Sequence, residues 1–208
     1  MKTQIVFCCA VSVALFFCCK GSVVKDKDTP PTVHSQSNQD TTTAMEMDYL
    51  AKGKSMVTEA QAVLAKNLMG AVSSGGTDYA LEFCNSKAII LTDSMSGVLN
   101  SNIKRVSDQP RNAANLANEM ELEYILLLKD QMGKGEVPAG KVHTINGKIL
   151  GLYPIVTNAM CLQCHGKKEI DIKPATLRKI NKLYPDDKAT GYGVDELRGL
   201  WVVEMNKK

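Results

Sequence analysis

Apolar residues in the first half of the chain recur at helical spacing. From Met47 to Val72 they follow the i, i+3, i+4 pattern of one buried helix face, and the run Ser73-Ser74-Gly75-Gly76 ends that pattern. A second helix is predicted from residue 77 or 78 to about residue 96, with one stripe of mostly small or apolar residues (Ala80, Cys84, Ala88, Leu91 and Met95). The pattern therefore predicts two amphipathic helices separated by a glycine pair.

In the middle of the chain, a segment with turn-forming residues is followed by a segment with helical periodicity. Residues 103–112 are predicted to be irregular and polar, because Ser107-Asp108-Gln109-Pro110 is typical of a turn and Pro110 disfavours helical geometry at Gln109. A third helix is predicted from about Ala113 to Met132, ending at Gly133.

Short strands are predicted in the last third of the chain. Residues 142–145 and 148–156 flank Asn146-Gly147, the strongest short signal for a two-residue hairpin turn. Thr176 is predicted to cap a short helix that runs through Leu183, and residues 199–205 form a final strand. Helices followed by a small antiparallel sheet indicate an α+β domain.

The N-terminus has the pattern of an export signal. Lys2 precedes an apolar run from Ile5 to Cys19, which is short for a membrane span but typical of a secretory signal. Residues 15–20 also resemble a bacterial lipobox, which makes residues 1–19 a lipoprotein signal and Cys19 the lipidated first residue of the mature protein. Phe16 and Phe17 depart from the usual lipobox, so an ordinary cleaved signal or an uncleaved anchor remains the alternative. The expected location is periplasmic or otherwise extracytoplasmic, with a lipid anchor in a bacterial membrane.

The amino-acid composition distinguishes a polar linker, residues 20–44, from a single folded domain, residues 45–208. Residues 20–44 are rich in Lys, Asp, Thr, Pro, Ser, Gln and Asn and are predicted to be a flexible polar linker, in which His34 is a solvated residue. Residues 45–208 fit one domain large enough to enclose a cofactor. The formal charge of +3 is small and the basic residues are dispersed, so nucleic acid is not an expected partner.

One pentapeptide, Cys161-Leu162-Gln163-Cys164-His165, has the CxxCH pattern. In this pattern two thiols attach haem covalently and the adjacent imidazole binds the iron. Cys161 and Cys164 are therefore the predicted anchors, and His165 is the predicted axial ligand. The alternatives are a chance CxxC, a redox dithiol or half of a zinc site, but an export signal in the same chain supports haem, since c-type haem is attached outside the bacterial cytoplasm.

The residues alone leave the sixth iron ligand open among Cys84, His143, a methionine and water. Cys84 lies between Ala80 and Ala88, which leave room for a flat porphyrin beside the helix. The competing interpretation of Cys84 is a small buried hydrophobic residue. A zinc site made of Cys84, Cys161, Cys164 and His165 is a further alternative, although ligation by the adjacent Cys164 and His165 would strain a tetrahedral site.

Four segments together resemble a known family. They are residues 80–85 (ALEFCN), 103–108 (IKRVSD) with Arg111-Asn112, 161–166 (CLQCHG), and 183–192 (LYPDDKATGY) with 197–201 (LRGLW). They are similar to the PAS-like c-type haem domain family, first described in a cyanobacterial protein and long catalogued as a domain of unknown function. The family also forms the sensor region of some histidine kinases and chemoreceptors. The resemblance spans residue 45 to the C-terminus.

The resemblance implies a PAS-like antiparallel sheet with long N-terminal helices enclosing one covalently bound haem c, with His165 and Cys84 as axial ligands. Of the basic residues in these segments (Lys104, Arg105, Arg111 and Arg198), Arg105 and Arg111 are the candidates for binding the haem propionates. The sequence departs from the family in lacking the proline that usually follows Arg111-Asn112, and in having Val194-Asp195-Glu196 in place of a Gly-Asp pair.

The leading functional hypothesis is a redox or diatomic-gas sensor, in which a change at the iron weakens its bond to Cys84 and shifts the second helix. Such a chain needs a separate signalling or redox protein as partner. The runner-up is a periplasmic electron-transfer cytochrome. A peroxidase-like enzyme ranks third, because the sequence offers no convincing distal acid and base pair.

Overall fold

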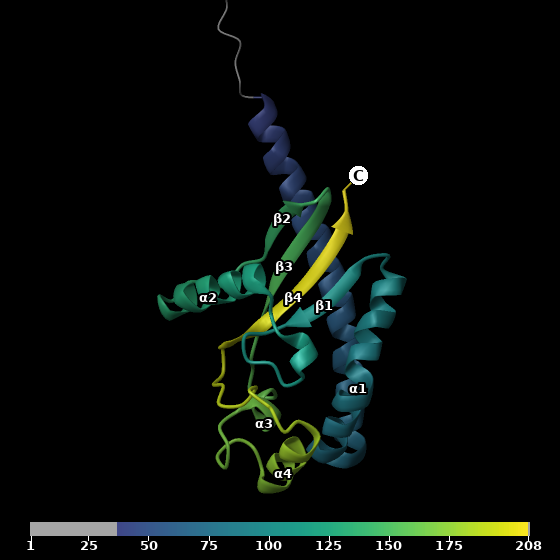
Figure 1. The fold of residues 1–208 in the computed structure, drawn as a ribbon, viewed down its shortest axis with the longest axis vertical. Helices are drawn as coiled ribbons and strands as arrows, with labels where there is room; N and C mark the ends of the chain where they lie inside the picture. Colours follow the sequence, from purple (N-terminus) through teal and green to yellow (C-terminus); the bar gives the residue numbers. More distant parts are fainter. Residues whose placement is uncertain (1–36, 208) are drawn as a thin grey trace, which may run out of the picture. The chain divides into compact units, whose positions relative to one another are not determined.

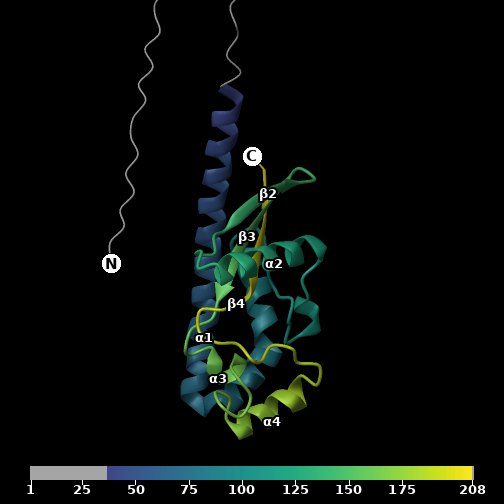
Figure 2. The same ribbon diagram turned by 90° about the vertical axis from the view of Figure 1, so that its left-hand side faces the viewer.

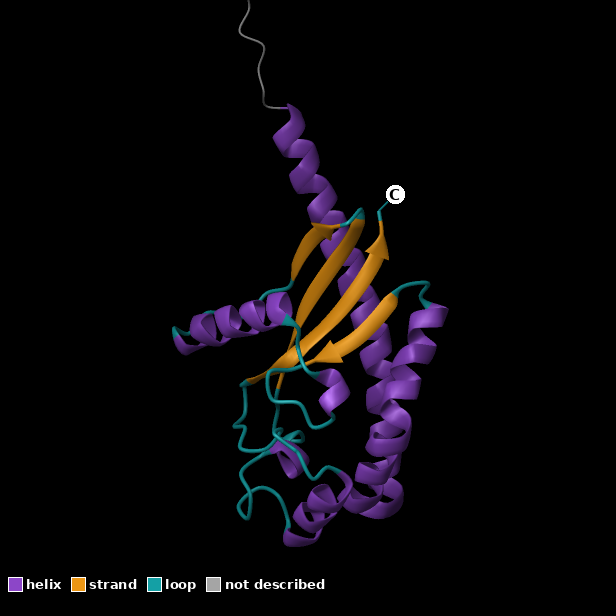
Figure 3. Ribbon diagram, viewed as in Figure 1, coloured by secondary structure: helices purple, strands orange, loops and turns teal. Residues whose placement is uncertain are grey.

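A four-stranded antiparallel sheet with the strand order β1-β4-β3-β2 forms the centre of the fold (Figures 1 and 3). The strands are β1 (Asn102–Val106), β2 (Lys141–Ile145), β3 (Lys148–Val156) and β4 (Leu197–Asn206). The computed structural model describes residues 37–207, and side chains from residue 43 onward. The α+β class predicted from the sequence is confirmed.

Helix α1 (Ser37–Val98) is a hairpin of two helical arms. Gly75 and Gly76 have non-helical backbone angles, and Gly76 has φ 70, where a side chain would be strained. The predicted break between two helices is therefore confirmed, and we name residues 37–74 the first arm and residues 77–98 the second arm. The first arm includes residues 37–44, which composition assigned to the linker. Adding turns to an existing helix costs far less free energy than nucleating one, so a helix extends readily beyond its packed part.

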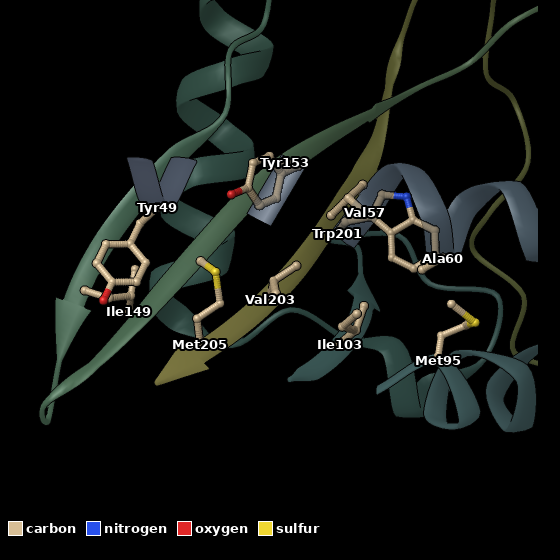
Figure 4. Close-up of a cluster of buried hydrophobic side chains, with 10 residues drawn as sticks. All are labelled: Tyr49, Val57, Ala60, Met95, Ile103, Ile149, Tyr153, Trp201, Val203 and Met205. Atoms are coloured by element: carbon tan, nitrogen blue, oxygen red, sulfur yellow. The ribbon is translucent and has the colours of Figure 1, made fainter. Parts of the chain in front are cut away.

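The sheet is packed between helices on both faces (Figure 2). Successive residues of β4 face opposite sides of the sheet. Trp201, Val203 and Met205 pack in the cluster with α1. Leu200 and Val202 pack in the cluster with α2 (Glu119–Gly133). Figure 4 shows the first cluster, in which Tyr49, Val57 and Ala60 of the first arm meet sheet residues. Because β4 lies between β1 and β3 and is covered on both faces, its central residues 200–203 are all apolar and buried.

Two predictions about the middle of the chain are wrong. Residues 102–106 form the edge strand β1, paired with β4, instead of an irregular segment; Ile103 and Val106 are buried against opposite clusters. The predicted third helix is divided into a 3-10 turn, η1 (Ala113–Asn115), and α2. The division has a local cause, since Asn118 and Glu121 form a capping box that starts α2 at Glu119.

The hairpin and the final strand are confirmed. Asn146 and Gly147 both have positive φ (51 and 76), as a type I′ turn requires, and they join β2 to β3. Two short helices follow, α3 (Leu162–His165) and α4 (Pro174–Leu183). Helix α4 ends at the predicted residue but begins with Pro174 after Lys173, so Thr176 is not its cap. Among the described residues, no helix has the length and apolarity needed to cross a bilayer.

Candidate functional site

The CxxCH motif forms a single helical turn, α3, which follows β3 after residues 157–160. The amide of His165 donates to the carbonyl of Cys161 at 2.9 Å, which brings both ends of the motif together. Cys161 and Cys164 are free, half-buried thiols. Gly166 ends the turn where a Cβ would overlap the Asp171 side chain and the Leu162 carbonyl, so only glycine fits there. The predicted anchor residues and His165 therefore lie together on one rigid turn.

His165 is oriented by a backbone carbonyl. Its Nδ1 lies 2.7 Å from the oxygen of Ala189. Burial lowers the pKa of His165 well below its ordinary value, and the charges of Arg111 and Arg198 lower it further. The imidazole is therefore neutral, and its single proton belongs on Nδ1, where the carbonyl accepts it. This leaves the lone pair of Nε2 available to a metal, the usual arrangement of a histidine ligand with a second partner.

The segment that follows α4 holds the motif from the other side. The amides of Gly191 and Tyr192 donate to the carbonyls of Gly166 and His165 at 2.8 and 3.0 Å. The guanidinium of Arg111 donates to the Cys164 carbonyl at 2.6 Å and also pairs with Asp187. Arg111 thus ties the motif to this segment, a role that the sequence did not suggest.

Cys84 lies on the second arm of α1, between the buried residues Ala80 and Ala88. Burial raises the pKa of the Cys84 thiol, while the charges of Arg105 and Arg111 lower it. Burial likewise raises the pKa of Cys164 to about 11, and Cys84 is among the neighbours that contribute to this shift. The second arm therefore brings Cys84 into the electrostatic neighbourhood of the CxxCH motif and of two arginines.

Arg105 is a buried cation with an unused donor. It lies on β1 opposite Trp201 of β4, and its guanidinium carbon is 5.5 Å from the centre of the indole ring. Its Nε atom is buried and has no hydrogen-bond partner within the part of the chain that the structure describes. Burial lowers the pKa of Arg105, whereas Cys84 raises it. A buried arginine with an unsatisfied donor suits an anionic group at this position.

Arg198 is a site residue to which the sequence assigned no role. Its Nη1 donates to Ser107 Oγ at 2.7 Å, and its guanidinium lies over the ring of Tyr192 at 5.3 Å. Its Nε is 3.4 Å from His165 Nδ1. Because Nδ1 carries the proton that it donates to the carbonyl of Ala189, it cannot also accept a hydrogen bond from Arg198. The only signal for Arg198 was its place in the LRGLW segment, which gives no hint of its distance from His165.

The other candidates lie elsewhere. His143 is on strand β2, opposite Leu150, and its pKa is lowered by burial and by Lys141. Within residues 37–207, no three His, Cys, Asp or Glu side chains are grouped as a metal site, so the zinc alternative gains no support. A cavity of about 470 Å³ borders Lys129 and Met132 but none of the three described cysteines, and it shares Gly191 and Tyr192 with the segment that holds the CxxCH motif. Cys19 and His34 lie outside the described residues.

Comparisons with known proteins agree with the fold. The chain is similar to the solved crystal structure of the cyanobacterial heme-protein Tll0287, with a TM-score of 0.54 and 20% sequence identity over 73% of this chain and 93% of that one. No curated protein matches the chain. The family model described as Tll0287-like matches residues 32–206, which includes every described element and all the site residues above. This chain is therefore a member of the Tll0287-like family.

Proposed function

We propose that this protein carries one haem c, joined to Cys161 and Cys164, with His165 and Cys84 as axial ligands, and that it senses redox state or a diatomic gas. The observation that carries the proposal is the orientation of His165, whose Nδ1 is occupied by Ala189 while Nε2 is left for iron. The name of the similar solved protein, a heme-protein, supports the same cofactor.

The residues present fit a haem group. Two thiols and an imidazole lie on one turn, small residues flank Cys84, and the unused buried donor of Arg105 suits a propionate. Bound haem would supply an iron that changes charge by one electron and binds diatomic gases. Burial raises the pKa of Cys84, and the cations of Arg105 and Arg111 offset only part of that rise, so the charge of a bound iron would have to supply the rest of the stabilisation of the thiolate.

Cys84 is the residue suited to transmit a signal, because the arm that carries it is fastened at both ends. Near its start, Thr77 shares a hydrogen bond of 2.6 Å with Thr176 of α4. Near its end, Ser96 Oγ accepts the amide of Ile103 of β1 at 2.9 Å. Holding or releasing Cys84 would therefore change the strain on an arm that links α4 to the sheet.

The protein is further proposed to act outside the cytoplasm, attached to a membrane through lipidated Cys19. The apolar run of residues 5–19 after Lys2 supports this location. Labelling with a radioactive fatty acid tests it, with Cys19→Ser as the variant expected to lose the label and Cys18→Ser as the variant expected to keep it.

The cofactor is tested by expressing the full chain with a c-type haem maturation system. We expect a Soret band, and a pyridine haemochrome spectrum that identifies thioether-linked haem. Cys84→Ser should abolish the absorption spectrum expected of a low-spin ferric haem with a thiolate ligand. The matched control, His143→Gln, should leave the ferric spectrum unchanged. A colourless protein would contradict haem attachment, and an unchanged Cys84→Ser spectrum would exclude Cys84 as ligand.

The second candidate is a periplasmic electron-transfer cytochrome, in which the iron would keep both axial ligands while it passes single electrons to a partner. Binding of carbon monoxide to the reduced protein distinguishes the sensor from the electron-transfer cytochrome. Rapid binding to the reduced protein with displacement of Cys84 supports sensing, whereas a reduced protein that does not react supports electron transfer.

A further inference from the structure

The charge of the described chain is unevenly distributed. Residues 167–188, which follow the CxxCH motif directly, hold seven basic residues (Lys167, Lys168, Lys173, Arg178, Lys179, Lys182 and Lys188) and four acidic ones (Glu169, Asp171, Asp186 and Asp187). The other residues of the range 37–207 hold 13 basic and 16 acidic residues. This short segment is therefore formally +3, while the rest of the described chain is −3.

Internal contacts do not neutralise this excess. Asp187 is nearly buried and pairs with Arg111, Lys179 pairs with Glu82, and the Asp171 carboxylate accepts the backbone amide of Lys167. The remaining six basic side chains are exposed and make no ion pair within residues 37–207, and only Glu169 and Asp186 are exposed acids beside them. We name these six residues (Lys167, Lys168, Lys173, Arg178, Lys182 and Lys188) the basic surface.

Local stability does not account for the basic surface. Helix α4 contains no acidic residue, so Arg178 and Lys182, one turn apart, repel each other without compensation. Lys173 is the N-cap residue, where the helix dipole disfavours a positive charge. Lys182 lies in the last turn, where the helix dipole favours a positive charge, but its repulsion with Arg178 and the position of Lys173 are unfavourable in the isolated chain and would be relieved by an anionic partner.

The basic surface is held firmly beside the CxxCH motif. Leu81 of α1 packs with Ile172 and Ile180, and Cys164 contacts the same cluster. Figure 1 shows α3 and α4 next to each other, at the end of the described chain opposite the first turn of α1. The side of the molecule that carries the basic residues is therefore also the side on which the thiols would anchor haem.

We propose that the basic surface docks an acidic electron-transfer protein that exchanges electrons with the haem, an inference that rests on the proposed haem attachment. In the exchange, one electron leaves the reduced partner, which is oxidised, and reduces the ferric iron to ferrous. Complementary charge would orient the partner at the haem side and raise the rate of encounter. A protein fits better than a membrane, because the basic surface adjoins the turn whose thiols would anchor haem, and a lipid surface has no electron to exchange there.

Stopped-flow reduction of the haem-loaded full chain tests the proposal, with a reduced acidic flavodoxin as the donor. The variant Lys173→Gln/Arg178→Gln/Lys182→Gln removes three charges from the basic surface, all of them on α4 or at its N-cap and none in the segment that holds His165. The matched control, Lys54→Gln/Lys66→Gln/Lys207→Gln, removes three exposed charges elsewhere. We expect the first variant to lower the second-order rate constant about tenfold at low salt, and the control by less than about twofold. High salt should abolish the difference.

Each other outcome overturns the inference. Equal effects of the two variants would show that only net charge matters, and no effect of either would show that the basic surface is not used. Cosedimentation of the wild-type protein, but not the first variant, with vesicles of anionic phospholipid, together with an unchanged rate constant, would assign the basic surface to a membrane. A normal Soret band in these cases leaves the proposed function standing, whereas a colourless wild-type protein overturns both.

Discussion

Arg111 and Asp187 form the least exposed ion pair of the site. Their side chains are 10% and 6% exposed, and the pair spans 3.1 Å. Asp187 also accepts the amide of Ala189 at 2.9 Å, and the carbonyl of Ala189 orients His165. One carboxylate therefore supports both the arginine that holds Cys164 and the residue that fixes the histidine.

We expect Asp187→Ala to lower the free energy of unfolding by about 3 kcal/mol, because it leaves a buried guanidinium without its partner. The adjacent Asp186 is exposed, so Asp186→Ala should change this free energy by less than about 0.5 kcal/mol. Urea unfolding of both variants and the wild type gives the comparison. Equal destabilisation by the two substitutions would contradict a structural role for the Asp187 carboxylate.

At the scale of elements, Tyr153 sets how closely the first arm of α1 approaches the sheet. Its hydroxyl donates to the carbonyl of Leu50 at 3.0 Å, and its burial raises its pKa to about 12. The phenol lies where Gly53 of α1 has no side chain, and a Cβ there would overlap the hydroxyl. The absence of a side chain at one helical position thus lets helix and strand meet.

We expect opposite effects from two glycine substitutions in the same arm. Gly53→Ala should destabilise the protein by about 1–3 kcal/mol, because the added methyl forces Tyr153 to move within a packed core. Gly70→Ala, which meets no atom within 4 Å, should stabilise it by about 0.5–1 kcal/mol, since alanine is the better helix former. Thermal unfolding of both variants checks the signs, and stabilisation by Gly53→Ala would contradict the packing described.

At the scale of the whole molecule, His165 couples folding to pH when no haem is bound. The folded chain lowers the pKa of His165 well below 6.5 through burial and through Arg111 and Arg198. The unfolded chain regains a pKa of about 6.5 and so binds a proton that the folded chain does not. The stabilising effect of a neutral His165 is complete above pH 6.5 and is lost as the pH falls below it.

We expect the haem-free protein, made by Cys161→Ala/Cys164→Ala, to lose up to about 1.4 kcal/mol of unfolding free energy per pH unit below pH 6.5 from this residue. Adding His165→Gln should remove that part of the slope between pH 6.5 and 5 in urea unfolding. His143, whose pKa is also lowered, contributes equally to both proteins and cancels in the difference. Identical slopes would show that His165 does not titrate as described.

The sequence by itself determined the features that depend on a few neighbouring residues. Gly75-Gly76 interrupts α1, and Asn146-Gly147 forms the turn that joins β2 to β3. The CxxCH spacing places two thiols and an imidazole on one helical turn. These were predictable because the backbone angles and spacings that they need are local properties of the chain. The capping box of Asn118 and Glu121 was equally local, and it could have been recognised.

Only the tertiary structure decided which distant residues meet. Strand β1 exists because Ile103 pairs with Val203, and its own sequence reads as polar and irregular. Arg111 turned out to pair with Asp187, and Arg198 to lie beside His165, although neither neighbour can be inferred from charge alone. Burial and pairing are properties of two segments at once, so the free energy that fixes them is absent from either segment taken alone.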